Sequence, residues 1–543
     1  MANGILTQLL NSDHKPDILD CIANLSNDEV FTPPKMANKV LDALPAEVWT
    51  NSELKWLDPA VKTGVFLREI AKRLMVGLAD EFPDEEKRRE HIFGRMLYGI
   101  AITELTALMS RRSLYTSKNA GGEKSIAHFS DNAGNIDYEN RDHSFGADGK
   151  CVYCRLSRDE AKLGSRKDSQ EKHAYKFIHL SKKEVENMHF DVIVGNPPYQ
   201  LSDGGFGASA RPIYHLFVEQ ARKLNPHYMA FIIPSRWSVG GGKGLGKFRD
   251  DMLNDPHLRH IYDYPDSKDC FPGVEVKGGV MYFIWDKTYS GRTKIHTITS
   301  EEELPTVTLD LHKFNFIIRY KELAEILEIV WPNGPVSTDD SRSIGSQISV
   351  LKPYGLRTDI FRDPSKYGLP PLYKSPEKAN PKAPIGALQI HGLDNTKRAI
   401  RYASADYPLS VGRDTVMKWK VFVPNAYGCG ALGETIPSPI LGSPIQICSE
   451  TYLRFGTWDT KDEASAALKY LKTKFFRVLV GAKKTTQHTT RDTYSLVPMQ
   501  DFTEKSDIDW TKSIPELDAQ LYAKYKLSDA EIKFIETMVK EMM

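Results

Sequence analysis

An apolar run that ends in Asn196-Pro197-Pro198-Tyr199 is the strongest chemical signal in the sequence. The run, FDVIVGNPPYQL over residues 190–201, predicts a buried strand that stops at two prolines, because proline cannot donate to a strand ladder and restricts the residue before it. Parallel sheets place active sites at such strand ends. We therefore expect the Asn196 amide, the Pro197 carbonyl and the Tyr199 ring to face one small pocket.

Two fixed oxygen acceptors and an aromatic plate suit a planar base that carries an amino group. The amino nitrogen of adenine is a poor nucleophile because its lone pair is delocalised into the ring, and two acceptors that bind its hydrogens would favour a tetrahedral, reactive form. Taking a base out of its stack costs roughly a few kcal/mol, which stacking on Tyr199 would partly offset. The alternative interpretation is that residues 196–199 form only a strand-terminating turn.

FDVIVGNPPY resembles the catalytic motif of S-adenosylmethionine-dependent amino-group methyltransferases, and more closely that of the adenine-specific DNA enzymes of bacterial restriction-modification systems. The order of segments, with a cofactor loop before this motif and a variable region after it, is similar to their gamma class. The resemblance implies methyl transfer from S-adenosylmethionine to the N6 amino group of an adenine flipped out of double-stranded DNA. It also makes a separate restriction endonuclease a candidate partner.

The same resemblance implies a cofactor site upstream of the motif. NDEVFTPPKMANKVLDAL is similar to the segment that caps the methionine end of the cofactor, and LDPAVKTGVFLREIAKRL to the first cofactor loop, where a tight turn lets backbone N–H groups approach a carboxylate. The chain departs from the family at Val61-Lys62-Thr63, where small residues are usual, and at Ala101, where an acid usually grips the ribose. The expected cofactor residues are Phe31, Thr32, Pro33, Asp58, Pro59, Ala60, Gly64, Phe66, Glu104 and Asn196. The alternatives are a strand-to-helix turn without a ligand and, for Glu104, an ordinary solvent-facing glutamate at a helix N-terminus.

Contacts to the substrate are expected from one aromatic residue and from three basic loops. Phe271 is the candidate for a second ring against the flipped base, with an ordinary core position as the alternative. The segments RWSVGGGKGLGKFR, MKWKVFVPNAYG and KKTTQHTTRDTYSLVP mix Lys and Arg with Gly, Thr and aromatic residues, which suits loops that meet phosphates and base edges. The expected DNA contacts are Lys243, Lys247, Lys418, Lys420, Lys483, Lys484 and Arg491, each of which has a solvated surface charge as its alternative.

A CxxC pair followed by histidines predicts a structural zinc site. The candidate ligands are Cys151, Cys154, His173 and His179, with His143 as an alternative to His179. A zinc ion would tie down a polar segment that has no core of its own, and methyl transfer itself needs no metal. The alternative is two reduced cysteines and unrelated histidines.

The elements that must position these residues alternate between short apolar runs and helical patterns, which is typical of a mostly parallel sheet covered by helices. Strands are predicted at 55–57, 96–100, 175–180, 190–194, 229–233, 260–264 and 279–285, and helices at 66–78, 103–115, 183–188 and 212–223. We expect an α/β, Rossmann-like methyltransferase domain at 29–330 after a leader at 1–28, with 117–174 as an insertion. Pro- and Gly-punctuated strands then predict a mixed, β-rich target recognition domain at 331–500 and a helical segment at 501–543.

Bulk composition agrees with a multidomain globular protein. The chain has 543 residues, 41% of them hydrophobic and 26% charged. No apolar run approaches the roughly 20 residues that cross a bilayer, and six cysteines make no disulfide framework, so a cytoplasmic protein without a membrane partner is expected. The net charge of +1 neither supports nor excludes a nucleic-acid partner.

Three other functions fit parts of the pattern. Protein glutamine methyltransferases also use an Asn-Pro-Pro-Tyr turn on an amide nitrogen, but the C-terminal region would then have no explanation. A bifunctional restriction enzyme that both cuts and methylates would need a nuclease, and the sequence contains no convincing carboxylate and lysine cluster for one. The departures at residues 61–63 and 101 leave open a non-catalytic DNA-binding relative.

Overall fold

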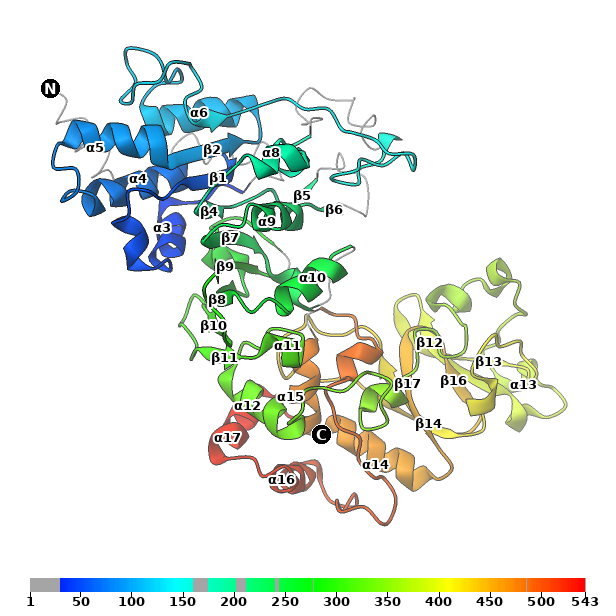
Figure 1. The fold of residues 1–543 in the computed structure, drawn as a ribbon. Helices are drawn as coiled ribbons and strands as arrows, with labels where there is room; N and C mark the ends of the chain where they lie inside the picture. The colour runs from blue at the N-terminus through cyan, green and yellow to red at the C-terminus, as the bar shows by residue number, and fades with distance from the viewer. Residues whose placement is uncertain are drawn as a thin grey trace. The chain divides into compact units, whose positions relative to one another are not determined.

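The computed structural model describes residues 30–159, 174–201, 211–239, 244–276, 278–484 and 486–542. The chain forms two compact units, Met1–Ile317 and Ile318–Met543 (Figure 1). The predicted leader at 1–28 lies outside the described residues. None of the described helices is both long enough and apolar enough to cross a membrane.

The first unit is built on a nine-stranded sheet with the order β11-β10-β8-β9-β7-β4-β1-β2-β3. Its strands are β1 (Trp56–Val61), β2 (Leu97–Ala101), β3 (Ile136–Asp137), β4 (Val192–Gly195), β7 (Tyr228–Pro234), β8 (Leu258–Tyr264), β9 (Val280–Asp286), β10 (Thr293–Thr297) and β11 (Val307–Leu309). From β3 to β7 all neighbours are parallel, whereas β9 runs antiparallel to both β7 and β8. The predicted α/β class is therefore confirmed.

Both faces of this sheet are covered, because successive strand residues point to opposite faces and both sets are buried. On one face, Trp56, Val192 and Val194 share a core cluster with apolar side chains of α3 (Pro34–Asp42), α4 (Val65–Gly77) and α6 (Glu104–Tyr115). On the other, α9 (Tyr214–Lys223) packs against β7. Figure 1 shows α4 and α6 beside strands β1 and β2. The shorter helices are α5 (Glu85–His91), α8 (Lys182–Glu186), α10 (Gly246–Leu253) and α11 (Leu311–Phe314).

One predicted strand is wrong. Residues 175–180 contain the short 3-10 helix η4 (Phe177–His179) instead, and the edge position beside β2 is taken by β3 from within the predicted insertion. The apolar side chains of 175–180 find another place to bury themselves. The Phe177 ring stacks on Phe217 of α9 with centroids 5.9 Å apart, and Tyr175 packs on the same ring. Burial without a strand partner thus explains why an apolar run here does not join the sheet.

The second unit combines two three-stranded sheets, ordered β13-β12-β16 and β15-β14-β17, with several helices. The strands are β12 (Leu388–Asp394), β13 (Lys397–Ala403), β14 (Trp419–Pro424), β15 (Ile440–Gly442), β16 (Gln446–Cys448) and β17 (Tyr452–Trp458). The helices are α12 (Lys321–Val330), α13 (Pro376–Ala379), α14 (Lys461–Lys472), α15 (Lys474–Lys483), α16 (Ile514–Lys524) and α17 (Asp529–Met538). Ser513 and Ser528 begin the last two helices, each with a capping box to a glutamate three residues on, as expected of the helical end of the chain. Helix α12 packs on α15 and α17 and so belongs to this unit.

Candidate active site

Asn196 follows directly on β4, which lies between β1 and β7 in the middle of the sheet. Its side chain is buried, and Nδ2 donates to the Val30 carbonyl and to Thr32 Oγ1, both at 3.1 Å. Because a nitrogen must face the Val30 carbonyl, these bonds fix the orientation of the amide. Oδ1 is left buried with no hydrogen-bond partner among the described residues. Such an orphaned acceptor costs about 1–3 kcal/mol unless a ligand supplies the donor.

Asn196 lines a small hollow, open to solvent, beside the carboxyl-terminal half of β1 and the start of α4. The lining residues are Thr32, Asp58, Ala60, Lys62, Thr63, Gly64, Val65, Phe66 and Asn196. The loop into α4 requires glycine at position 64, where φ is +74° and a Cβ would lie 3.2 Å from the Ser110 backbone of α6. The structure therefore brings Asn196 together with much of the predicted cofactor loop.

Asp58 lines the hollow at the point where the β1–β2 register shifts, between Asp58 and Val61. Pro59 lies inside that irregularity, where its lack of an N–H costs no ladder bond. The Asp58 carboxylate accepts from the Ala60 amide at 3.1 Å. Burial raises the pKa of Asp58 to about 7, against the lowering effects of that hydrogen bond and of Lys62. Its carboxyl group can therefore gain or lose its charge near neutral pH, and a cation beside it would favour the charged form.

Lys62 is a lining residue that the sequence analysis missed. Its buried side chain donates from Nζ to the Val30 carbonyl at 2.9 Å, the same oxygen that Asn196 binds. Two donors from two different strand ends thus hold the segment at 30–32 against the site. The departure from the family pattern at Val61-Lys62-Thr63 was the signal that could have identified Lys62. A lysine in a loop where small residues are usual has to direct its amine to an acceptor or a ligand near that loop. Thr63 and Val65 line the hollow as well.

Several predicted cofactor residues do not line the hollow. Phe31 and Pro33 are half-buried on either side of Thr32, and Pro59 is buried in β1. Glu104 is exposed in the first turn of α6, where Thr103 caps the helix, so its position matches the alternative of a solvent-facing N-terminal glutamate.

The two aromatic residues expected at the base belong to one buried cluster. Tyr199 is 9% exposed and Phe271 is 1% exposed. The Cys270 thiol, next to Phe271, interacts electrostatically with the Tyr199 hydroxyl. Burial raises the pKa of Tyr199 well above its usual value, and its Oη has no hydrogen-bond partner among the described residues. The Tyr199 carbonyl accepts from Ile213 N at 3.1 Å, which closes a hairpin of β5 (Gln200–Leu201) and β6 (Arg211–Pro212). Pro197 and Pro198 are buried between Asn196 and Tyr199.

The structure buries the amines of two predicted DNA contacts, Lys420 and Lys484. Lys420 is fully buried in β14, and its Nζ donates to the carbonyls of Thr415, Val416 and Gln446 at 2.8–3.1 Å. Lys484 is 3% exposed and donates to Glu434 at 2.6 Å and to the Tyr427 carbonyl. Neither ammonium can reach a phosphate without breaking these bonds.

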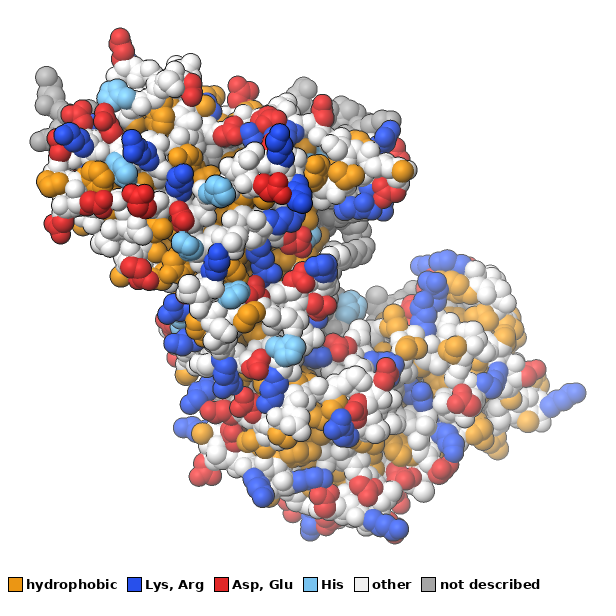
Figure 2. All heavy atoms as spheres, in the orientation of Figure 1, with side chains coloured by type: hydrophobic (Ala, Val, Ile, Leu, Met, Phe, Trp, Pro, Cys, Tyr) orange, Lys and Arg blue, Asp and Glu red, His pale blue; other side chains and the backbone are white. Residues whose placement is uncertain are grey.

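The other described candidates lie at or near the surface in ion pairs. Lys247 pairs with Asp251, Lys418 with Asp459, Lys483 with Asp492 and Arg491 with Asp339. Lys243 lies outside the described residues. Figure 2 shows Lys and Arg side chains interspersed with Asp and Glu over the visible face.

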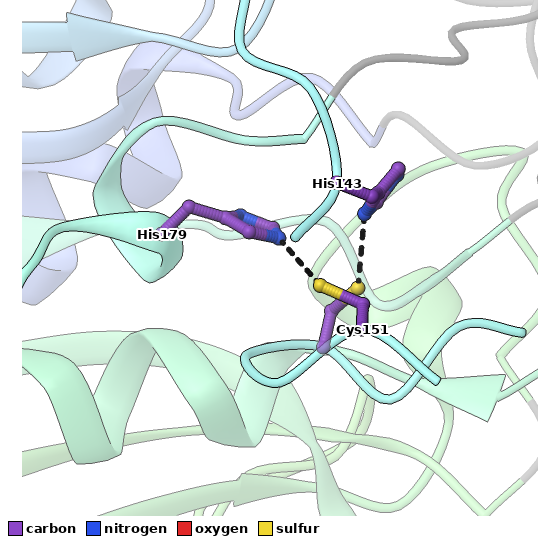
Figure 3. A group of neighbouring side chains, drawn as sticks. His143, Cys151 and His179 are labelled. Carbon is purple, nitrogen blue, oxygen red and sulfur yellow. Dashed lines mark hydrogen bonds between the residues drawn. The ribbon is translucent and has the colours of Figure 1, made fainter. Parts of the chain in front are cut away.

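The Cys and His side chains of the predicted metal site form a cluster apart from this hollow. Its members are His143, Cys151, Cys154 and His179, whose potential ligand atoms all lie within 4.8 Å of one another. Both cysteines and His179 are buried, and Figure 3 shows His143, Cys151 and His179 converging from separate segments. His173, which the sequence analysis placed in the set, lies outside the described residues, and His143 joins His179 rather than replacing it.

Known proteins resemble the chain around this site. The family model described as Eco57I restriction-modification methylase matches residues 95–271, which include Asn196 to Tyr199. A protein of Mycoplasma pneumoniae described as an uncharacterized adenine-specific methylase is 40% identical over 330 residues, which cover 56% of this chain and 78% of that protein.

Solved structures are similar at lower identity. A modification subunit of a putative type I restriction enzyme from Vibrio vulnificus is 17% identical with a TM-score of 0.32, over 52% of this chain and 50% of that one. The chain thus spans about half the length of that subunit. The type IIL restriction-modification enzyme MmeI, solved in complex with DNA, is 12% identical with a TM-score of 0.46, over 96% of this chain and 77% of that one. Given the 40% identity over most of the Mycoplasma protein and the family match across the Asn196 motif, the chain belongs to the adenine-specific methylase family of restriction-modification type.

Proposed function

We propose that the protein transfers a methyl group from S-adenosylmethionine to the N6 amino group of an adenine in double-stranded DNA. One observation carries the proposal: the buried, oriented and unpartnered Oδ1 of Asn196 beside a hollow at the end of β4. An amino group of a base supplies the donor that this oxygen lacks. Family membership selects adenine as the base.

The lining of the hollow fits S-adenosylmethionine. Gly64 and Val65 begin α4, so their backbone N–H groups lie at a helix N-terminus, which suits the carboxylate of the donor. The Asp58 carboxyl, whose pKa burial raises to about 7, suits the ammonium of the same molecule. Bound S-adenosylmethionine supplies a methyl group that is already activated on a sulfonium, so the task left to the protein is to position and polarise the acceptor base.

Asn196 performs that task with the two polar atoms of its side-chain amide, Nδ2 and Oδ1. The Val30 carbonyl and Thr32 Oγ1 hold Nδ2, which leaves Oδ1 to accept a hydrogen of the adenine amino group. The Pro197 carbonyl is the proposed second acceptor. If both acceptors are fixed before the base arrives, no polar group has to reorient during the reaction. This preorganisation is the main source of such catalysis.

The base itself is proposed to leave the duplex and to stack on Tyr199, with Phe271 as the second ring. Both belong to one buried cluster, and contact of the base with their rings would offset part of the cost of unstacking it. We further propose that residues 331–500 select the target sequence. Lys418, Lys483 and Arg491 of this region, and Lys247 of the first unit, would exchange their aspartate partners for phosphates.

Sequencing of DNA from cells that express the chain, by a method that reports modified bases, tests the function. The expected result is N6-methyladenine within one short sequence motif, which is absent from cells that express Asn196→Ala at the same level. Unmodified DNA in the presence of folded, donor-binding protein would overturn the proposal. A pattern of modification that survives Asn196→Ala would overturn the assigned role of this residue.

A further inference from the structure

We infer that His143, Cys151, Cys154 and His179 bind one structural Zn²⁺ ion and that this ion holds the loop with residues 143, 151 and 154 to η4, which packs against α9. The four side chains come from three separate stretches of the chain, and their ligand atoms lie within 4.8 Å of one another. This cluster has no part in the proposed methyl transfer, so its role stands or falls independently of that function.

Two pairs of ligand atoms have the spacing of a tetrahedral site. Cys151 Sγ lies 3.6 Å from His179 Nε2, as drawn in Figure 3. Cys154 Sγ lies 3.4 Å from His143 Nδ1. Bonds of about 2.3 Å to sulfur and 2.0–2.1 Å to nitrogen place neighbouring ligands of a tetrahedral zinc ion about 3.4–3.8 Å apart. The two pairs therefore already have the separation that a shared ion would impose.

The chemistry of the donors selects the metal. Two thiolates and two imidazoles favour Zn²⁺ over Mg²⁺ or Ca²⁺, which prefer oxygen ligands. All four positions are filled by protein, and both sulfurs and His179 are buried, so no position is left open for a substrate or a reactive water. These two features assign a structural rather than a catalytic role.

Surrounding hydrogen bonds hold His179 in a ligating orientation. Its Nδ1 lies 2.8 Å from the Tyr175 carbonyl, so Nδ1 carries the proton and Nε2 is directed toward Cys151 with its lone pair available. Arg141 donates to the His179 carbonyl at 3.0 Å and also pairs with Glu139 and Glu184. Outer contacts of this kind are typical of metal-binding histidines.

The position of His179 determines which part of the fold the ion would stabilise. His179 ends η4, which packs against α9 through Phe177 and Phe217. Helix α9 begins directly after the β5–β6 hairpin that follows Tyr199. Within the described residues 143–159, the loop that carries Cys151 and Cys154 has two isolated bridges, Phe145 to Cys151 and Lys150 to Ser157. An ion here would anchor this polar loop to the element that supports α9.

Metal analysis of the purified full chain tests the inference without any assay of methylation. We expect one equivalent of zinc, a tetrahedral thiolate spectrum when Co²⁺ replaces it, and a fall in melting temperature of more than about 5 °C when a chelator removes it. Cys151→Ser should lose the metal, whereas Cys429→Ser, which changes an exposed cysteine outside the cluster, should keep it.

His143→Ala provides the milder variant if Cys151→Ser fails to fold, since His143 is only half-buried. It should lower zinc occupancy or affinity by at least tenfold while the chain stays folded. Three results would each overturn the inference: folded chain without metal, a melting temperature that a chelator does not change, or a disulfide between Cys151 and Cys154 in the native protein.

Discussion

Asn196 in the first unit and Lys420 in the second are both buried polar side chains at the centre of a sheet, but their hydrogen bonding differs. Lys420 Nζ donates to three carbonyls, so each of its protons has an acceptor. Asn196 has its nitrogen paired and its oxygen unpaired among the described residues. A satisfied buried group stabilises the fold, whereas a half-satisfied one beside a hollow marks the place of a ligand.

The Lys484–Glu434 pair extends the pattern of the second unit. Glu434 Oε1 accepts from the backbone amides of Cys429, Gly430 and Ala431, and Oε2 binds Lys484 at 2.6 Å. Although burial raises the pKa of Glu434, the ion pair and the amides bring it down to about 2. Both charges are thus used to close the loop at 428–434, which leaves them unavailable for DNA.

The largest expected effect is that of Asn196→Ala. Loss of the Oδ1 acceptor should lower kcat for DNA methylation by about 10²–10³-fold, because one preorganised polar contact to the reacting group is removed. Methyl transfer to duplex DNA and calorimetry of S-adenosylmethionine binding provide the two measurements. Donor affinity should change by less than about tenfold.

Thr32→Val is the matched control for this variant. It removes one acceptor of Asn196 Nδ2 but leaves the Val30 carbonyl and Oδ1 in place, so the expected loss in kcat is less than about tenfold. If Thr32→Val and Asn196→Ala reduce kcat equally, the free oxygen is not the feature that matters.

Lys420→Met should act on stability and not on DNA binding. The variant leaves three buried carbonyls without their donor, so we expect the second unit to lose about 2–4 kcal/mol of stability. Thermal unfolding measures this, with Lys418→Met as a control on a partly exposed lysine nearby in the sequence. The salt dependence of DNA binding by the folded Lys420→Met protein should equal that of the unaltered chain. A reduced salt slope would show that Lys420 reaches a phosphate after all.

Donor binding should depend on pH through Asp58. Its pKa of about 7 in the folded chain lies above the usual value near 3.9, so the folded state holds more protons between those values and the ligand-free chain loses stability as pH rises from about 4 to 7. The ammonium of the donor favours the carboxylate, so affinity should fall by up to about tenfold per pH unit below 7. Calorimetry from pH 6 to 8 measures this fall, and Asp58→Asn should bind weakly with no such slope. A pH slope that persists in Asp58→Asn must come from another group.

The smallest expected effect is that of the surface cations. Lys247→Gln or Arg491→Gln should weaken DNA binding a few-fold at physiological salt and reduce the slope of log K against log salt by about 1. Lys533→Gln, which changes an exposed residue of α17 outside the proposed recognition region, is the control and should leave the slope unchanged. Equal slopes for all three variants would show that Lys247 and Arg491 do not contact DNA phosphates.

Much of the first unit was predictable because its central strands are continuous apolar runs between turn residues. Strands β1, β2, β4 and β7 to β9 all overlap predicted ranges. Strand β3 has two residues, too short for any pattern, and the apolar run at 175–180 buries itself on α9 instead. The segment KDEASAALKYLK has helical spacing and forms α14. This helix was not predicted, because the whole region was assigned to strands separated by Pro and Gly.

The site residues that were predictable depend on local interactions, whereas those that were missed depend on contacts between segments distant in sequence. The Asn196 turn, the Gly64 loop and the CxxC pair depend on neighbours in sequence and were predictable. The burial of Lys420 depends on carbonyls at 415, 416 and 446, and the position of Lys62 depends on Val30, so these contacts appear only once the chain is folded.

The Val30 carbonyl, which accepts from both Lys62 Nζ and Asn196 Nδ2, makes the two ends of the site thermodynamically interdependent. A methyl donor that draws the Lys62 amine away would strengthen the remaining bond to Asn196 and stiffen its amide before the base arrives. Reciprocity then requires that a bound adenine alter the dissociation constant of the donor by the same factor. A single backbone oxygen can in this way couple the binding of the two substrates.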